Sequence, residues 1–264
     1  LLARLVARLV DADFSRIQFT PDLMPSDVLG TTVFNMKTND FDFHRGPIFA
    51  DIVLVDEINR APAKTQAALF EVMEERQVSI DGTTHQMGEL YTILATQNPV
   101  EQEGTYKLPE AQLDRFLMKL TMDYPSLDEE VNILERHHTN AAFVKLEDIT
   151  PAITKEELLS LRNLMKQVFI DRTLLQYIAL IVQQTRTSKA VYLGASPRAS
   201  VAMLQSSKAY ALLQGRDFVT PEDIKFVAPY VLQHRLILTA EAEMEGYSPV
   251  KVTQRLIDKV EVPK

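Results

Sequence analysis

The stretch Ile52–Glu57 reads Ile-Val-Leu-Val-Asp-Glu, four consecutive apolar residues followed by two carboxylates. An apolar run of this length predicts a strand that is buried on both faces, as in a parallel sheet. Ligands of such sheets bind at the carboxyl ends of the strands, which is where the two acids stand. Asp56 could hold the water shell of a Mg²⁺ ion, and Glu57 could orient and deprotonate a water molecule. Two acids that simply enter a solvated loop would give the same pattern.

The segments around this strand alternate between strand and helix patterns. Residues 1–10 have apolar residues at helical spacing, and residues 15–20 predict a short strand. Residues 62–76 predict a helix, and residues 91–97 and 116–121 predict two more strands. This alternation favours an α/β layer with parallel strands.

Two short hairpins are predicted within the same region. Residues 31–34 and 41–43 are brief alternating runs that could pair with each other. Residues 78–85 contain Asp81-Gly82, a favoured two-residue turn between two short strands. We therefore expect both hairpins to be attached to the α/β layer.

After Pro125 the strands largely stop, and signals for helix starts take over. A hydroxyl or carboxylate side chain that precedes a helix can accept hydrogen bonds from its first N–H groups. The sequence thus predicts two domains, an α/β core over residues 1–125 and a smaller all-α domain over residues 126–264. The predicted caps are Ser126 with Glu129, Thr154 with Glu157, Asp171, Ser196 before Pro197, and Thr220 before Pro221.

Asn98 ends the predicted strand over residues 91–97, next to the strand that ends in the two acids. A neutral amide there could hold an attacking water molecule or a terminal phosphate group. Asn98-Pro99 would also make an ordinary turn, and for this dipeptide alone the turn is the more common case. Asn98 by itself therefore does not define a site.

Two arginines offer positive charge for a phosphate group. Arg115 precedes the predicted strand over residues 116–121, and its planar donor fork could act as an arginine finger for a neighbouring subunit. A surface ion pair with Asp114 or Glu110 is the ordinary alternative. Arg198 lies in the first turn of a predicted helix, where a cation opposes the helix dipole unless a bound anion or a nearby acid compensates for it.

Composition narrows the class of protein. The chain has 264 residues, of which 46% are apolar and 24% charged, which fits a soluble globular protein with two domains. It has no cysteine, no signal peptide and no apolar run of the ~18 residues that a membrane span needs, so we expect a cytoplasmic protein. The net charge of −8 disfavours a broad nucleic-acid-binding surface.

Longer stretches around the candidate residues resemble the MoxR family of AAA+ ATPases. The similarity covers nearly the whole chain, and five motifs occur in the order that the family has. Residues 52–62 resemble the extended Walker B segment, residues 95–99 and 101–106 the sensor 1 region, residues 108–116 the arginine-finger segment, residues 194–199 the start of the sensor 2 helix, and residues 17–27 the stretch after the Walker A helix.

The resemblance implies an αβα AAA+ core followed by a helical lid. Residues 21–49 and 77–89 would be the two insertions that place the family beside minichromosome-maintenance helicases and magnesium chelatases. By motif position, Asp56 would hold Mg²⁺ through water, Glu57 would activate the attacking water, Asn98 would be sensor 1, Arg115 the finger and Arg198 sensor 2.

The resemblance further implies ATP and Mg²⁺ as cofactors and a homo-oligomer, namely a hexameric ring with ATP bound between subunits. Such proteins remodel or activate partner proteins in a chaperone-like way, often together with a von Willebrand factor A domain protein. Two alternatives stay open. One is an AAA+ scaffold that does not hydrolyse ATP, and the other is a DNA helicase-like motor, which the net charge of −8 disfavours.

One departure from the family is large. No G-x-x-x-x-G-K-[ST] motif occurs in the 264 residues, although this Walker A loop supplies backbone N–H groups and a lysine to the phosphates. In the family the loop comes immediately before the helix that begins here at Leu1, and a strand precedes it. That strand lies between those predicted at 116–121 and 91–97, and its loss would leave two buried edges unpaired. We therefore expect the native chain to extend upstream.

Overall fold

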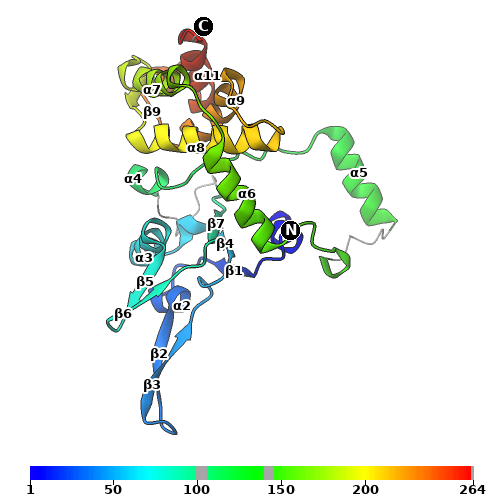
Figure 1. Ribbon diagram of the computed structural model, residues 1–264, viewed down its shortest axis with the longest axis vertical. Helices are drawn as coiled ribbons and strands as arrows, with labels where there is room; N and C mark the ends of the chain where they lie inside the picture. The colour runs from blue at the N-terminus through cyan, green and yellow to red at the C-terminus, as the bar shows by residue number, and fades with distance from the viewer. Residues whose placement is uncertain (99–105, 107, 140–145, 263–264) are drawn as a thin grey trace. The chain divides into compact units, whose positions relative to one another are not determined.

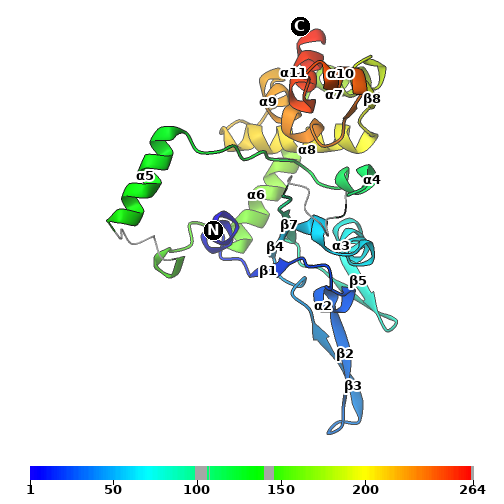
Figure 2. The same ribbon diagram turned by 180° about the vertical axis from the view of Figure 1, so that it is seen from behind.

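A computed structural model describes residues 1–98, 106, 108–139 and 146–262. Figures 1 and 2 show it from opposite sides. The chain divides into two compact units, the first formed by residues 1–108 with 123–159 and the second by residues 109–122 with 160–264. The expected domain boundary between residues 125 and 126 stays a prediction.

The first unit is built on a parallel sheet of three strands in the order β1-β4-β7. The central strand β4 pairs in parallel with both neighbours, and its side chains Ile52, Val53 and Val55 are buried. This burial confirms the strand predicted from the apolar run and the α/β fold class. The strands are β1 (Phe14–Gln18), β4 (Ile52–Asp56) and β7 (Thr92–Ala95).

Helices accompany this sheet in the first unit. The helix α3 buries Leu69, Phe70 and Val72, while α1 buries only Ala3 and Ala7. None of the side chains of α5 is buried, and this helix lies apart from the sheet in both views (Figures 1 and 2). The helical segments that lie wholly within this unit are α1 (Leu2–Leu9), α2 (Pro25–Leu29), η1 (Ile58–Arg60), α3 (Ala63–Glu75), α5 (Leu127–His138) and η2 (Leu146–Asp148), and α6 (Lys155–Gln167) begins here and continues into the second unit.

Both predicted hairpins are present. The hairpin of β2 (Gly30–Asn35) and β3 (Asp40–Arg45) extends away from the sheet, as Figure 1 shows. The hairpin of β5 (Gln77–Ile80) and β6 (Thr83–Gln86) turns at Asp81-Gly82, whose φ angles of 50° and 79° are both positive, as a type I′ turn requires. The short helix α2 was not predicted, because five residues are too few to show a helical period.

The second unit is mostly helical, as predicted. Its core holds Tyr177 and Ile181 of α7, Met203 of α8, and Ile224 and Leu232 of α9. The antiparallel pair of β8 and β9 was not predicted, since strands of three and two residues carry no readable alternation. The remaining elements are α4 (Glu110–Leu113), α7 (Arg172–Thr187), β8 (Val191–Leu193), α8 (Pro197–Leu213), α9 (Pro221–Leu232), β9 (Ile237–Leu238), α10 (Ala240–Met244) and α11 (Pro249–Lys259).

The predicted helix caps are confirmed in both units. For example, the Asp171 carboxylate accepts a hydrogen bond from the N–H of Thr173 at 2.8 Å, at the start of α7. At Ser126, Thr154, Asp171 and Ser196 the side-chain oxygen satisfies an N–H group that the helix leaves without a partner. At Thr220, the Asp223 carboxylate accepts from the Thr220 N–H at 2.7 Å. The caps are Ser126, Thr154, Asp171, Ser196 and Thr220.

The strand predicted over residues 116–121 is wrong, because these residues form no strand. The N–H of Lys119 donates to the carbonyl of Tyr230 at 2.9 Å, and its carbonyl accepts from Nε2 of Gln233 at 2.5 Å. The end of α9 and the residues after it thus occupy the backbone groups that a sheet ladder would need. An apolar pattern cannot reveal such a partner, which lies more than one hundred residues away in the sequence.

Candidate functional site

The two acids lie at the carboxyl end of the central strand. Asp56 is the last residue of β4, where it stands opposite Gln18 of β1. One oxygen of its carboxylate, Oδ2, accepts a hydrogen bond from Nε of Arg16 at 2.6 Å. The other, Oδ1, accepts from the hydroxyl of Thr96 at 3.2 Å. Asp56 is therefore held from both neighbouring strands.

Glu57 takes up an unusual backbone conformation directly after this strand. Its φ of 54° and ψ of 51° place it in the left-handed region, which costs a residue with a side chain about 1 kcal/mol or more. Its Oε2 accepts hydrogen bonds from Nε2 of Gln18 at 2.9 Å and from NH1 of Arg60 at 3.0 Å. The strained backbone and the two donors together fix the direction of this carboxylate.

Thr96 connects the two acids. Its hydroxyl accepts a hydrogen bond from the N–H of Glu57 at 3.0 Å while it donates to Asp56. Its carbonyl also accepts from the N–H of Ile58 at 3.0 Å. The end of β7 thereby holds the chain at the point where it leaves β4.

Asn98 follows β7 at the same end of the sheet, and its side chain is exposed. Its carbonyl lies 3.5 Å from Nδ2 of Asn59, a buried residue in the turn that follows Glu57. The structure thus brings Asp56, Glu57 and the backbone of Asn98 together at the carboxyl ends of the strands. Residues 99–105, the greater part of the remaining sensor 1 segment, lie outside the described residues.

Sequence reasoning missed four residues of this site, namely Arg16, Gln18, Arg60 and Thr96. A signal for two of them existed, because residues two apart on a strand point to the same face. Arg16 and Gln18 are such a pair on β1, and the NH2 group of Arg16 donates to Oε1 of Gln18 at 3.2 Å. Recognising them required the register that sets β1 beside β4.

The acids fit a Mg²⁺ site only in part. Carboxylate oxygens are the hard ligands that this ion prefers, and the Asp56 side chain is 17% exposed. Among the residues that the structure describes, however, no group of three or more His, Cys, Asp or Glu side chains could hold a metal ion. A Mg²⁺ ion at Asp56 would therefore need further oxygen ligands from water and phosphate groups.

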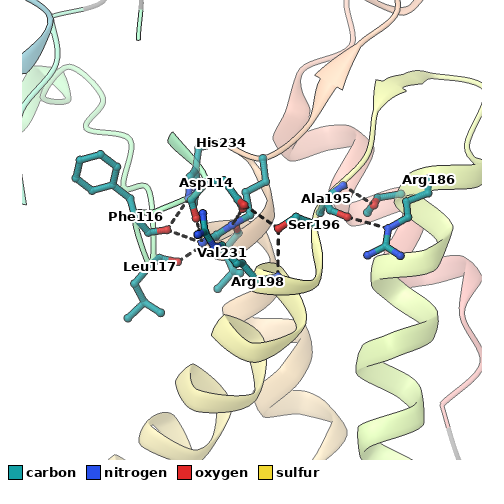
Figure 3. A network of polar contacts seen from close by, with 11 residues as sticks. Asp114, Phe116, Leu117, Arg186, Ala195, Ser196, Arg198, Val231 and His234 are labelled. Carbon is teal, nitrogen blue, oxygen red and sulfur yellow. Dashed lines mark hydrogen bonds and ion pairs between the residues drawn. The ribbon is translucent and has the colours of Figure 1, made fainter. Parts of the chain in front are cut away.

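The two candidate arginines belong to the second unit, where a polar network joins their segments (Figure 3). Asp114, which precedes Arg115, accepts a hydrogen bond from the hydroxyl of Ser196 at 2.7 Å. The same hydroxyl accepts from the N–H of Arg198 at 3.1 Å, at the first turn of α8. The expected finger segment and the expected sensor 2 segment are therefore hydrogen-bonded to each other.

Arg235 anchors this network. Its Nε donates to the Asp114 carboxylate at 2.8 Å, and its side chain is only 3% exposed. Its NH2 and NH1 groups also donate to the carbonyls of Asp114, Phe116, Leu117 and Val231. A buried guanidinium with this many acceptors fixes the backbone that follows α4.

His234 adds a second donor to the same backbone. Its Nε2 lies 3.0 Å from the carbonyl of Phe116. Burial, together with the positive charge of Arg235, lowers the pKa of His234 from 6.5 to about 4. The imidazole is therefore neutral at physiological pH, and Nε2 carries the proton that the Phe116 carbonyl accepts.

The start of α8 is also held from α7. Nε of Arg186 donates to the carbonyl of Ala195 at 2.9 Å, and the N–H of Ala195 donates to the hydroxyl of Thr185 at 3.0 Å. Gly194 lies so close to α7 that a Cβ atom there would meet the backbone of Arg186 at 2.8 Å. Only glycine permits this approach, so the segment before Arg198 has little freedom to move.

A parallel sheet with paired acids at the end of its central strand, together with a helical second unit, is the architecture of an AAA+ ATPase. The family model for "ATPase family associated with various cellular activities (AAA)" matches residues 1–118. A second model, for the AAA lid domain, matches residues 183–258. Both assignments agree with the fold and with the order of the motifs.

The relatives identify the family more narrowly. The chain is 43% identical to "Chaperone MoxR1" of Mycobacterium tuberculosis, over 98% of this chain and 70% of that protein. It is 47% identical to "Uncharacterized protein YeaC" of Bacillus subtilis, over 100% of this chain and 81% of that protein. A crystal structure described as a candidate ATPase from Cytophaga hutchinsonii is 41% identical, with a TM-score of 0.89 over 98% of this chain and 81% of that one. The chain belongs to the MoxR family of AAA+ ATPases.

This membership confirms the family that the sequence motifs indicated and the AAA+ core with a helical lid. No helix in the described part of the chain is both long and apolar enough to cross a membrane. The roles of Asp56, Glu57, Asn98, Arg115 and Arg198 remain predictions.

Proposed function

We propose that the protein hydrolyses ATP and uses the energy to remodel or activate partner proteins. The observation that carries this proposal is the arrangement of Asp56 and Glu57 at the end of β4. Arg16 donates to the Asp56 carboxylate, and Gln18 and Arg60 donate to the Glu57 carboxylate. Glu57 also has a strained backbone conformation. Strain of this kind persists where the surrounding structure enforces it, and it is frequent at active sites.

In this proposal the two acids have different roles. Asp56 would hold Mg²⁺ through water, next to Arg16, which donates to the same carboxylate. When bound, Mg²⁺ neutralises negative charge on the phosphate oxygens. Glu57 orients the attacking water and takes its proton, while Gln18 and Arg60 keep its carboxylate aimed.

The remaining candidates act on the phosphate groups. Asn98 offers a neutral amide next to the attacking water. Arg115 and Arg198 offer guanidinium groups that stabilise the negative charge of the transition state, Arg115 as a finger toward a neighbouring subunit. This division of roles rests on the family motifs and on the polar network that joins the segments of the two arginines.

We further propose that the protein works as a homo-oligomeric ring, as a hexamer with ATP between subunits. A finger supplied to a neighbour requires such an arrangement. A chaperone-like role is supported by the relative named "Chaperone MoxR1", and a von Willebrand factor A domain protein is the proposed partner from the family resemblance.

The decisive variant is Glu57→Gln in the full-length protein. It keeps the size of the side chain but removes the base, so ATP should still bind while turnover is lost. Glu71→Gln, at an exposed position on α3, is the matched control and should keep full turnover. Undiminished turnover in Glu57→Gln would remove Glu57 from the mechanism. A full-length protein that binds no ATP would favour the non-hydrolysing scaffold instead.

A further inference from the structure

We propose that Asp114 is a positioning residue that holds Arg115 and Arg198 in a fixed relation through the hydroxyl of Ser196. The inference rests on the proposed ATPase function, in which these two arginines act on phosphate charge. It concerns contacts within the second unit only.

The first support is the geometry of the Asp114 carboxylate. Oδ2 accepts the hydroxyl proton of Ser196 at 2.7 Å, and Oδ1 accepts from Nε of Arg235 at 2.8 Å. Each oxygen therefore has a donor from a different part of the helical unit, as Figure 3 shows for Ser196. Hydrogen bonds to an ionised group are roughly twice as strong as those between neutral groups.

The second support is the double use of the Ser196 hydroxyl. A hydroxyl has one proton to donate and two lone pairs to accept with. Ser196 gives its proton to Asp114 and accepts from the N–H of Arg198 at 3.1 Å. The residue that caps α8 is thus also the bridge to the residue that precedes Arg115.

A helix cap does not need this bridge, as α11 demonstrates. Ser248 caps α11 by accepting from the N–H of Lys251 at 3.3 Å, and Pro249 follows it just as Pro197 follows Ser196. Within the described residues, Ser248 has no carboxylate partner. Capping alone therefore does not explain the bond from Ser196 to Asp114, which is consistent with a separate positioning role.

The third support is the rigidity of the segment on the other side of the bridge. Arg235 donates to the carbonyls of Asp114 at 3.0 Å and of Phe116 at 2.5 Å, so the backbone on both sides of Arg115 is fixed. Arg186 and Gly194 fix the approach to Ser196 in the same way. The Ser196–Asp114 hydrogen bond directly connects these two held segments, one next to Arg198 and the other next to Arg115.

The test compares Ser196→Ala with Ser248→Ala in the full-length protein. Both variants remove a serine cap that precedes proline, and Ser196→Ala should lower Tm more than Ser248→Ala, because it also removes the hydrogen bond to the Asp114 carboxylate. Only Ser196→Ala removes the bridge, so it should lower kcat about tenfold, while KM for ATP changes less than about twofold. Ser196→Thr keeps a hydroxyl at this position and should restore most of the turnover.

A second readout does not depend on turnover. Amide hydrogen exchange should speed up at residues 114–117 in Ser196→Ala, although these residues lie far from the substitution in the sequence. In Ser248→Ala, faster exchange should stay confined to α11. Equal kcat in the two alanine variants, or unchanged exchange at 114–117, would overturn the positioning role. A wild-type protein that shows no turnover at all would instead overturn the proposed ATPase function, and hydrogen exchange would still decide whether the bridge exists.

Discussion

The acids at the end of β4 and the network around Asp114 are both clusters of paired charges, but they differ in burial. The side chains of Arg16 and Arg60 are 51% and 36% exposed, whereas that of Arg235 is 3% exposed. Exposed pairs contribute little to stability, while breaking a buried pair leaves an uncompensated charge. The first cluster is thus suited to chemistry and the second to holding two arginines in place.

The largest effect should come from Arg235→Met. This substitution leaves the Asp114 carboxylate and several carbonyls without their donor, so it should lower the free energy of unfolding by about 3–5 kcal/mol. Arg16→Met removes an exposed partner of Asp56 and should cost no more than about 1 kcal/mol. Denaturant titration of both variants measures these losses. Equal losses of unfolding free energy would contradict the proposed difference in burial between the two clusters.

A second, smaller effect should appear on acidification. The pKa of His234 is lowered from 6.5 to about 4 in the folded protein. Between these two pH values, His234 is mostly protonated in the unfolded chain and mostly neutral in the folded one. The stability that comes from the neutral His234 is therefore fully present above pH 6.5 and is lost as the pH falls toward 4. The total loss at pH 4 should approach about 3 kcal/mol. His234→Gln should flatten this part of the pH profile, and an unchanged profile in that variant would assign the loss to other groups.

Gly194→Ala should have an intermediate effect. The new Cβ would meet the backbone of Arg186 at 2.8 Å, so the segment before α8 must shift, at a cost of about 1–2 kcal/mol. The shift would also disturb Ser196, so turnover should fall. At Gly88 a Cβ would meet only Asp51, at an ordinary 3.5 Å, so Gly88→Ala is the control and should leave stability and turnover unchanged. Thermal melting and turnover measurements on the two variants test this, and matching results would show that the segment before α8 is not tightly held.

The smallest effect on stability belongs to Gln18→Ala. Its bond to Glu57 is exposed, so the free energy of unfolding should change by less than about 0.5 kcal/mol. Turnover should nevertheless fall several-fold, because the Glu57 carboxylate loses one of its two donors. Gln86→Ala removes a comparable exposed bond, to Gln77 in the β5–β6 hairpin, and should leave turnover unchanged. Normal turnover in Gln18→Ala would mean that this contact does not orient Glu57.

The parts of the fold that local sequence determines were predictable. The apolar run of β4, the Asp81-Gly82 turn and the capping residues all act through neighbours in the sequence. The strand predicted over residues 116–121 failed because its backbone groups bond to the residues around 230–235, which no local pattern reveals.

Some residues of the candidate site could likewise be predicted from local sequence, and others could not. Asp56, Glu57 and Asn98 could be named because each follows a strand that the sequence indicates. Arg16 and Gln18 could not, because their place beside the acids depends on the register of β1 against β4. Asp114 was weighed only as an ion-pair partner of Arg115, whereas the structure bonds its carboxylate to Ser196 and Arg235.

ATP turnover by full-length Glu57→Gln, measured together with its ATP binding and its Tm, tests the central claim most directly. If the acids at the end of β4 carry the chemistry, phosphate release is lost while ATP still binds and Tm stays within about 2 °C of wild type, because the replaced side chain is partly exposed. Phosphate release at the wild-type rate from an ATP-bound, folded variant would contradict the account.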